Sequence, residues 1–336
     1  MLVDMAIYLG HNTARRILES KLALNLEPVP QHSMVNCETG KKAVTGTIRA
    51  AFKDGNIVQP LAHNFFCHGD EPLDLMTDDP NARHVWKGGR THLVPTKLPN
   101  GSFMHLNVGI YVASPALCLV QHASLLTRIE LVQLAMSFCG IYQLEGDEQR
   151  GPYTREPIAT PRDILSYLNR AKEMRGAAMV EEAMKWVIPN SGSQMETKMA
   201  LSMYLSRRLG GYGLPRPTMN ARIPLSEDMS DMLDQSCCYG DAIWHRNGYV
   251  PFDMEFQSYE HHLSAEKYAV DIARQLAIQH EGYDVQFVTK HQLDNHDQLN
   301  ELARLVAAHT GVRLPESAFE WPQSRIDRHE ALMSTF

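Results

Sequence analysis

The clearest pattern in the chain is a strict alternation of apolar and polar side chains from Phe252 to Gln257. Successive side chains of a β-strand point to opposite faces, so this pattern predicts a strand with one apolar and one polar face. The two faces carry Phe252, Met254 and Phe256 on one side and Asp253, Glu255 and Gln257 on the other. A helix and a further strand are expected downstream, and a strand with such a crossover is usually central and covered. The presence of three polar side chains on a covered face of the sheet therefore needs an explanation.

Hydrophobic periodicity divides the rest of the last third of the chain into a regular series of elements. The predicted order is helix, strand, strand, strand, helix, strand and helix: 194–209, 218–225, 239–245, 249–258, 264–282, 285–289 and a helix through Leu299, Leu302 and Leu305. Gly210-Gly211-Tyr-Gly is a C-terminal signal that ends the first of these helices. This order predicts a mixed sheet flanked by helices.

Weaker patterns precede this region. A short helix is expected near the start of the chain, with Asn12 or Thr13 as its N-cap. Leu98-Pro-Asn-Gly-Ser is a turn signal that suggests a hairpin between Thr91–Val94 and Phe103–Val112. These elements predict a mixed N-terminal region.

Helical periodicity then becomes dominant. Leu117 to Tyr142 carries apolar residues at helical spacing, with an interruption near Thr127. Thr160-Pro-Arg-Asp places an N-cap, a first-turn proline and an acid in order, and so opens a helix to about Arg170. Gly176 to Ile188 predicts another amphipathic helix.

The polar, turn-rich run Pro189-Asn-Ser-Gly-Ser is the clearest domain boundary, because it separates two predicted helices. The length of 336 residues suits two domains. We therefore predict an α/β (α+β) protein: a mixed, mostly helical N-terminal domain over 1–190, a mixed sheet flanked by helices over 191–312, and a tail over 313–336.

Composition narrows the protein class. No stretch approaches the roughly 18 apolar residues that a membrane span requires, so no membrane partner is expected. Asp4 stands where a signal peptide would carry positive charge, which favours a cytoplasmic protein. The six cysteines are scattered without a C-x-x-C pair and predict neither a disulfide framework nor a structural zinc site. There is no phosphate-cradling glycine-rich loop of the P-loop or dinucleotide kind.

The turn before the alternating strand leaves the register open. A two-residue hairpin at Asn247-Gly248 would pair Asp241 with Met254, away from Glu255. A three-residue loop would set Asp241 opposite Asp253, on the side of Glu255. A metal site needs the second register, because hard oxygen ligands must converge on one ion.

Several motifs of the last third resemble one known family. They are Ser193-Gln-Met-Glu-Thr, Leu214-Pro-Arg-Pro, Asp241-Ala-Ile-Trp, Glu255-Phe-Gln-Ser with His262, Asp271 and Arg274, and Gly282-Tyr-Asp-Val. In this order, from Ser193 to His309, they resemble the DUF559 family, which is related to the very-short-patch repair endonucleases of the PD-(D/E)XK superfamily. The resemblance implies a restriction-endonuclease-like sheet. The upstream half resembles the N-terminal part of abortive-infection antitoxin-like bacterial proteins through Val94-Pro-Thr-Lys to Gly109, Ala113-Ser-Pro and Phe138-Cys-Gly-Ile-Tyr.

The resemblance implies a Mg²⁺ or Mn²⁺ site. Asp241 matches the family's invariant metal ligand, and Glu255 matches its second carboxylate. Glu196 matches the helix acid that helps to position metal or water. Gln257 stands where the motif has a lysine, and glutamine supplies only a neutral dipole where lysine would stabilise developing charge.

Other residues can supply the positive charge that a lysine in place of Gln257 would provide. Lys267 or Arg274 of the following helix can supply it, and a solvated helix face is the alternative for both. His262 can act as general base or leaving-group acid, since its pKa suits neutral pH.

A DNA-binding domain in a chain of net charge −7 needs a local basic surface. The candidates are Arg207, Arg208, Arg216 and Arg222, together with Arg274. A solvated cluster of arginines is the alternative.

Two functions follow from these features. The first is a metal-dependent DNA endonuclease, in phage defence or repair. The second is a catalytically inactive relative that acts as an antitoxin-like DNA-binding transcriptional regulator, with a cognate toxin as protein partner. The retained Glu196, Asp241 and Glu255 favour the first, whereas Gln257 and the acidic balance favour the second.

Overall fold

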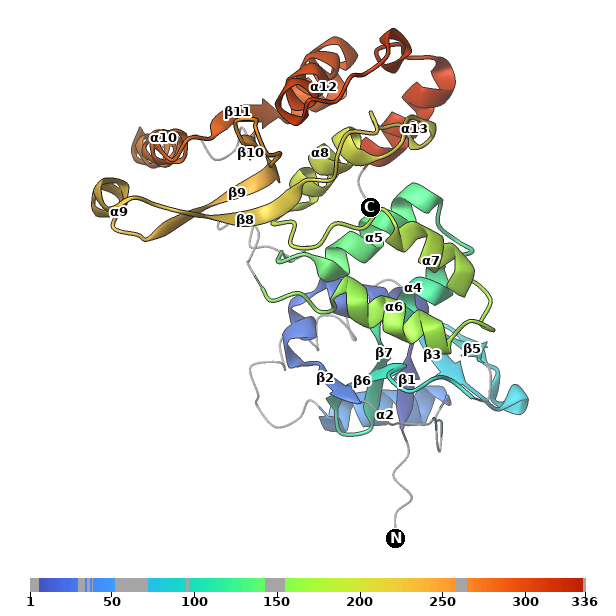
Figure 1. Ribbon diagram of the computed structural model, residues 1–336. Helices are drawn as coiled ribbons and strands as arrows, with labels where there is room; N and C mark the ends of the chain where they lie inside the picture. The colour runs from blue at the N-terminus through green and yellow to red at the C-terminus, as the bar shows by residue number, and fades with distance from the viewer. Residues whose placement is uncertain are drawn as a thin grey trace. The chain divides into compact units, whose positions relative to one another are not determined.

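The computed structural model divides the chain into two compact units (Figure 1). The N-terminal unit comprises residues 1–138 and 143–185, and the C-terminal unit comprises 139–142 and 186–336, so the division lies just before the predicted boundary. The structure describes residues 6–29, 34, 37, 39–51, 72–94, 97–142, 155–257 and 265–334. None of the helices within these ranges combines the length and the apolar character that crossing a bilayer requires.

The N-terminal unit contains a seven-stranded mixed sheet together with its helices. The strand order is β2-β6-β7-β1-β3-β5-β4, with β1 Ile7–Leu9, β2 Glu27–Val29, β3 Leu73–Thr77, β4 Val85–Trp86, β5 Gly89–Leu93, β6 Phe103–Asn107 and β7 Ile110–Ala113. β1 runs parallel to β7 and is buried along its whole length. Strands this short show too little alternation for sequence periodicity to reveal them.

The predicted hairpin between Thr91–Val94 and Phe103–Val112 does not form. β5 pairs with β3 and β4, whereas β6 turns directly into β7 and pairs antiparallel with it. Gly109 makes this tight turn possible with a φ of 72°, a region that disfavours residues with a Cβ. The turn signal before Phe103 is real, but the strands on its two sides belong to different pairs.

The helices of the N-terminal unit follow their predictions more closely. They are α1 His11–Glu19, α2 Lys41–Ala51, α4 Pro115–His122, α5 Arg128–Cys139, α6 Pro161–Arg170 and α7 Ala177–Met184, with short 3₁₀ helices η1 Lys21–Asn25 and η2 Pro80–Ala82. The predicted break near Thr127 is confirmed between α4 and α5. The opening of α6 is also confirmed, because Thr160 and Asp163 form a reciprocal capping box. α1 begins earlier than predicted and has Gly10 as its N-cap.

The C-terminal unit is built on a four-stranded mixed sheet with the order β11-β10-β9-β8. The strands are β8 Thr218–Pro224, β9 Cys237–Trp244, β10 Phe252–Gln257 and β11 Asp284–Thr289. β10 pairs antiparallel with β9 and parallel with β11, which confirms that the alternating strand is central. Both of its faces are covered, since Asp253 and Met254 are each 0% exposed.

The turn at Gly248 gives neither of the two predicted registers. The connection spans residues 245–251, and the pairs between the strands are Trp244–Phe252, Ile243–Asp253 and Ala242–Met254. Pro251 has no N–H with which to continue the ladder toward Gly248, so the strands part earlier than in a tight hairpin. Asp241 consequently stands opposite neither Met254 nor Asp253.

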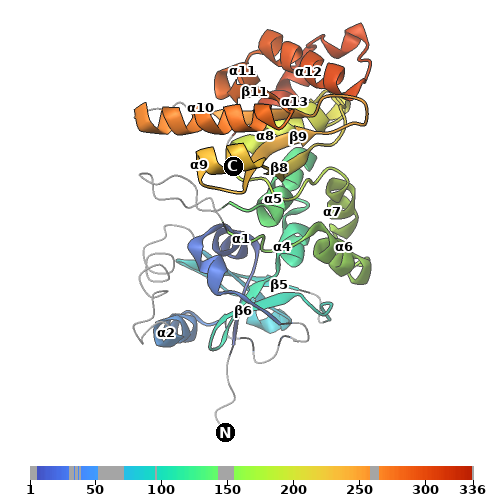
Figure 2. The ribbon, with the colours of Figure 1, turned by 60° about the vertical axis from the view of Figure 1, so that its left-hand side comes forward.

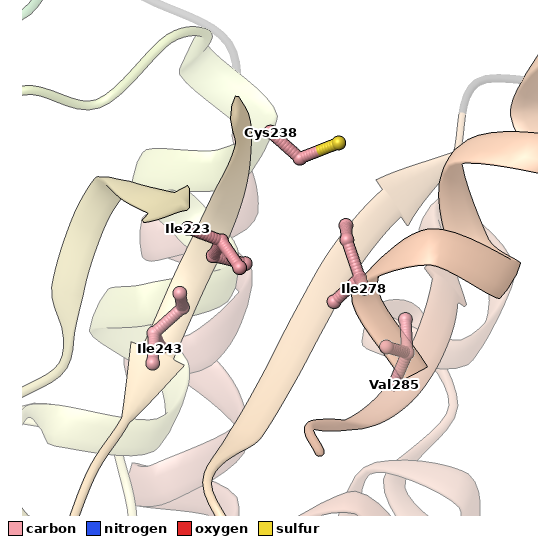
Figure 3. Close-up of a cluster of buried hydrophobic side chains, with 5 residues drawn as sticks. All are labelled: Ile223, Cys238, Ile243, Ile278 and Val285. Carbon is pink, nitrogen blue, oxygen red and sulfur yellow. The ribbon is translucent and has the colours of Figure 1, made fainter. Parts of the chain in front are cut away.

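Helices cover this sheet, and α10 Ala265–His280 runs beside it as a long helix (Figure 2). The others are α8 Gln194–Tyr204, η3 Arg207–Leu209, α9 Glu227–Leu233, α11 Lys290–Asp294 and α12 His296–Thr310. α8 packs on β9 and β10, α12 on β9, and α10 on β11. Ile278 of α10 meets the sheet in a buried apolar cluster with Ile223, Cys238, Ile243 and Val285 (Figure 3). This contact fixes α10 and places Arg274, one turn earlier, over the sheet.

Residues 313–334, which belong to the predicted tail, are an integral part of the C-terminal unit. They form η5 Glu316–Ala318 and α13 Gln323–Met333, and α13 packs on α8 and η3. Arg325 anchors the helix although it is only 4% exposed. Its guanidinium donates to the carbonyls of Ala318 and Gly211 and lies over the rings of Tyr212 and Trp321, 4.5 and 4.0 Å from their centroids. A charged residue at the centre of an aromatic cluster gives no hydrophobic signal in the sequence.

Replacing Arg325 with alanine is expected to lower the free energy of unfolding by about 3 kcal/mol, because buried carbonyls lose their donor and two rings lose a packing partner. Urea denaturation measures the change. Arg328→Ala, at an exposed position of the same helix, is the control and is expected to change the free energy by less than about 0.5 kcal/mol. Equal effects of the two substitutions would contradict the anchoring role of Arg325.

Candidate functional site

Four carboxylates and one guanidinium gather in the C-terminal unit and influence one another's charge. We call them the acidic cluster: Glu196 of α8, Asp241 of β9, Asp253 and Glu255 of β10, and Arg274 of α10. Of the predicted site residues, the structure thus brings together Glu196, Asp241, Glu255 and Arg274. Asp253 is an addition that the sequence analysis placed on the polar face without naming it as a site residue.

Glu255 and Arg274 form the centre of this cluster. Glu255 is 3% exposed, and its two carboxylate oxygens accept hydrogen bonds of 2.7 and 3.0 Å from the two Nη atoms of Arg274. The guanidinium also donates to the carbonyl of Tyr239. Burial works to lower the pKa of Arg274, but Glu255 above all raises it. Such a two-pronged, charge-assisted pair is among the stronger polar contacts in proteins.

Asp241 reaches β10 at an interruption of the neighbouring ladder. The pairs Met219–Ala242 and Ala221–Gly240 flank it, and Asn220, opposite, has a φ of 49°. Oδ2 of Asp241 accepts a 2.8 Å hydrogen bond from the backbone N–H of Phe256, which places the carboxylate beside Glu255. Burial, followed by Glu255 and Glu196, raises the pKa of Asp241 well above its usual range. The observed register leads from the pair Ala242–Met254 to Asp241 and Glu255, and so keeps Asp241 on the side of Glu255 although it is not the register that was expected to do so.

Glu196 is held at the start of α8 by local hydrogen bonds. The hydroxyl of the N-cap Ser193 accepts a 3.1 Å bond from the N–H of Glu196, and Oε2 of Glu196 accepts a 2.7 Å bond from the N–H of Gly192. Burial raises the pKa of Glu196, the bonds with Gly192 and Ser193 lower it, and Glu255 raises it further. The capping arrangement thus fixes a carboxylate that senses the charge of Glu255.

Asp253 is the most deeply buried carboxylate of the cluster. In the described ranges neither of its oxygens has a well-formed hydrogen bond, although Glu255 is near enough to affect its charge. A Cβ at Gly240 would lie 2.4 Å from Oδ2 of Asp253, so the carboxyl packs on bare backbone and requires a glycine there. Burial first, and then Glu255, raises the pKa of Asp253 to about 9. The group is therefore protonated at neutral pH.

The cluster suits a divalent cation in chemistry and in charge. Carboxylate oxygens are the ligands that Mg²⁺ and Mn²⁺ prefer, and burial first, with Glu255 adding to it, raises the pKa of Glu196, Asp241 and Asp253. Its present arrangement differs from a formed metal centre. Among the described residues no three His, Cys, Asp or Glu side chains are arranged to share an ion. Arg274 donates to both oxygens of Glu255, so an ion bound to this carboxylate would compete with it.

The remaining predicted catalytic residues lie at or beyond the end of β10. Gln257 is partly exposed and pairs with Thr289 of β11. His262 lies outside the described residues, and Lys267 lies in α10 with a side chain outside them. The roles of these three residues stay predictions.

The predicted basic residues lie on separate segments. Arg207 of η3 donates to the hydroxyl of Ser317 at 2.9 Å, and Arg208 beside it is exposed. Arg216, before β8, donates to the carbonyl of Val187, and Arg222 is exposed on β8. Arg208 and Arg222 thus present their charges to solvent, whereas Arg216 is engaged with the backbone.

Comparisons with known proteins yield no relative. No family model matches the chain, and no curated protein or solved structure does so either.

The buried proton of Asp253 makes stability depend on pH. Its pKa is about 9 in the folded protein and 3.8 ordinarily, so between these values the folded state binds a proton that the unfolded state has released. This contribution is fully present below about pH 4 and is lost as the pH rises toward 9. Asp253→Asn keeps the shape without titrating, so we expect it to flatten the decline in urea midpoint between about pH 5 and about pH 8.

The exposed Asp231 of α9 provides the control for this measurement. Asp231→Asn is expected to retain the pH profile of the wild-type protein. A wild-type profile in Asp253→Asn as well would show that Asp253 does not hold the buried proton.

Proposed function

We propose that the C-terminal unit is a metal-dependent endonuclease-like domain that hydrolyses phosphodiester bonds in DNA, in phage defence or repair. The convergence of Glu196, Asp241 and Glu255 from three different elements carries this proposal. Gathering carboxylates in a covered sheet costs free energy, so such groups are more often retained for chemistry than for stability. Their order along the chain also matches the resemblance to very-short-patch repair endonucleases.

Each residue of the acidic cluster discussed here would have its own role in such a site. A bound Mg²⁺ or Mn²⁺ ion would polarise the phosphate and lower the pKa of its water. Asp241 and Glu255 would hold it, and Oδ1 of Asp241 is the oxygen that the bond from Phe256 does not use. Glu196 would orient water from its fixed position at the start of α8. Arg274, once released from Glu255, would provide the positive charge that Gln257 does not.

Substituting Asp241 tests this assignment. Wild-type protein is expected to cut plasmid or single-stranded DNA in the presence of Mg²⁺ or Mn²⁺, followed on agarose gels. Asp241→Asn removes a ligand charge but keeps the shape, and is expected to lower the rate by more than about 100-fold, beyond the loss caused by outer-shell changes. Asp231→Asn is the control and should cut at the wild-type rate. Undiminished cutting by Asp241→Asn would refute the site.

The Arg274–Glu255 pair favours a second function, that of a catalytically inactive nuclease-fold protein. In this alternative the guanidinium permanently takes the place of an ion, which agrees with Gln257 in the position of the lysine. Such a protein would bind DNA as an antitoxin-like transcriptional regulator and have a cognate toxin as its partner. The exposed Arg208 and Arg222 would contact phosphates.

DNA binding without divalent ions tests this alternative. The double variant Arg208→Gln/Arg222→Gln is expected to weaken binding and to reduce the salt slope of log Kd by roughly one for each phosphate that the protein no longer neutralises. Fluorescence anisotropy at increasing salt measures both quantities. Arg313→Gln, at another exposed position of the same unit, should keep the wild-type slope. An unchanged slope in the double variant would exclude these arginines from the DNA interface.

A further inference from the structure

A second group of chemically active side chains lies in the N-terminal unit and is independent of the proposed nuclease function. We call it the His–Arg cluster: His11 of α1, Asp74 of β3, and Arg90 and His92 of β5. β3 and β5 are parallel, with Asp74 opposite Arg90 and Met76 opposite His92, so these side chains share one face of the sheet. α1 packs on β3 and brings His11 to them.

Asp74 positions the two basic side chains of β5. It is 0% exposed, and its Oδ1 accepts hydrogen bonds from Nε of Arg90 and, at 2.7 Å, from Nε2 of His92. Burial alone would raise the pKa of Asp74, but the bonds from His92 and Arg90 outweigh it and lower the pKa to about 2. Since the carboxylate is charged at neutral pH, Nε2 of His92 must carry the proton. Oδ2 of Asp74 is buried and has no hydrogen-bond partner among the described residues.

Both basic side chains extend from the buried Asp74 to the surface. The side chain of Arg90 is 44% exposed and that of His92 is 28% exposed. A buried carboxylate that orients an accessible guanidinium and an accessible imidazole is typical of a ligand site, because it limits their conformations before the ligand arrives. The acid lies beneath the donors, so an incoming anion meets Arg90 and His92 first.

His11 extends the cluster under backbone strain. Its ring stacks on that of His92 with centroids 3.9 Å apart, and the backbone N–H of His11 donates to Oε1 of Gln121 at 2.8 Å. Its φ of 48° lies in the left-handed region, which costs free energy for a residue with a Cβ. Burial first, and then His92, lowers the pKa of His11 to about 4. The ring is thus neutral at neutral pH and stacks on His92 without charge repulsion.

The turn that leads into α1 is suited to an anion. β1 ends at Leu9, and Gly10 connects it directly to α1. A Cβ at Gly10 would lie 2.7 Å from the sulfur of Met76, so only glycine allows this close approach. The N-cap Gly10 offers no side chain to the nine-residue helix, the side chain of Gln121 accepts from the N–H of His11, and the N–H groups of Asn12 and Thr13 make no hydrogen bond to any described residue. Free N–H groups and the helix dipole both favour negative charge at this end.

We propose that the His–Arg cluster and the amino end of α1 bind a phosphate group, carried by a nucleotide or by the 5′ end of a nucleic acid. Arg90 supplies a fixed positive charge, and the imidazolium form of His92 donates to the phosphate from Nδ1, the ring nitrogen that faces away from Asp74. The N–H groups of Asn12 and Thr13 supply further donors. The orphaned Oδ2 of Asp74 accepts from a hydroxyl or water that the ligand brings.

Titration calorimetry with the full chain tests the proposal, with inorganic phosphate, 5′-AMP and adenosine as probes. Phosphate and 5′-AMP are expected to bind, and adenosine is not. Arg90→Gln is expected to weaken binding of 5′-AMP at least about tenfold, the usual effect of losing a charged hydrogen bond. Failure of wild-type protein to bind either phosphate or 5′-AMP overturns the proposal, as does equal binding of adenosine.

Two controls locate the site. Arg83→Gln, at an exposed position of the same unit, should bind as wild type does, and an equal loss in Arg83→Gln and Arg90→Gln would overturn the assignment. If Arg90→Gln melts well below wild type, Arg90→Lys and His92→Asn replace it; Lys is expected to retain most of the affinity and Asn to lose it. The ring C–H signals of His92 in NMR spectra should also shift on addition of phosphate, and no shift would place the phosphate elsewhere.

A further comparison distinguishes the sources of the phosphate. A short single-stranded DNA is tested with and without a 5′ phosphate, again in wild type and in Arg90→Gln. Tighter binding of the phosphorylated strand than of 5′-AMP supports a nucleic-acid end, and the reverse supports a nucleotide. Binding of both strands with equal affinity, insensitive to Arg90→Gln, is expected if the DNA contacts lie in the C-terminal unit instead, and it would exclude the nucleic-acid end from this site.

Discussion

The two-pronged ion pair between Arg274 and Glu255 makes it possible for the C-terminal unit to carry carboxylates inside a covered sheet. An ionised carboxylate loses several kcal/mol of solvation on burial unless a partner compensates it. The guanidinium provides that compensation only if α10 lies over β10. The apolar contact of Ile278 with β8, β9 and β11 fixes the same helix one turn later (Figure 3). Charge balance and core packing therefore impose one common position on α10.

Burial of a carboxyl group has the opposite outcome in the N-terminal unit. Asp74 and Asp253 are equally buried, yet one has a lowered and the other a raised pKa. The difference lies in their partners: Asp74 receives hydrogen bonds from Arg90 and His92, whereas the charged neighbour with the largest effect on the pKa of Asp253 is another carboxylate, Glu255. Burial alone thus does not decide the charge of an acid. Asp74 is ionised and can orient the neighbouring basic side chains, whereas Asp253 holds a proton.

Sequence patterns predict those parts of the structure whose causes are local. The alternation from Phe252 to Gln257 predicts β10 and its two faces, and Thr160 with Asp163 predicts the start of α6, because both signals depend on neighbours in sequence. The register between β9 and β10 could not be predicted, since it depends on Pro251, where the strands part earlier than in a tight hairpin. The His–Arg cluster was missed because His11 and Asp74 are far apart in sequence. The spacing of Arg90 and His92 on one face of a strand was the available signal.

Competition for Glu255 gives both proposed functions of the C-terminal unit a single physical basis. A guanidinium brings one positive charge to the acidic cluster, and the cluster retains protons on its most buried acids. A divalent ion would bring two charges, lower the pKa values of Asp241 and Asp253, and so release protons as it binds. The ion must also compensate for the two strong hydrogen bonds that Arg274 gives up. If either proposed function holds, the relative affinity of Glu255 for two cations would decide between hydrolysis and DNA binding, and Gln257, which adds no charge, leaves that balance to Arg274.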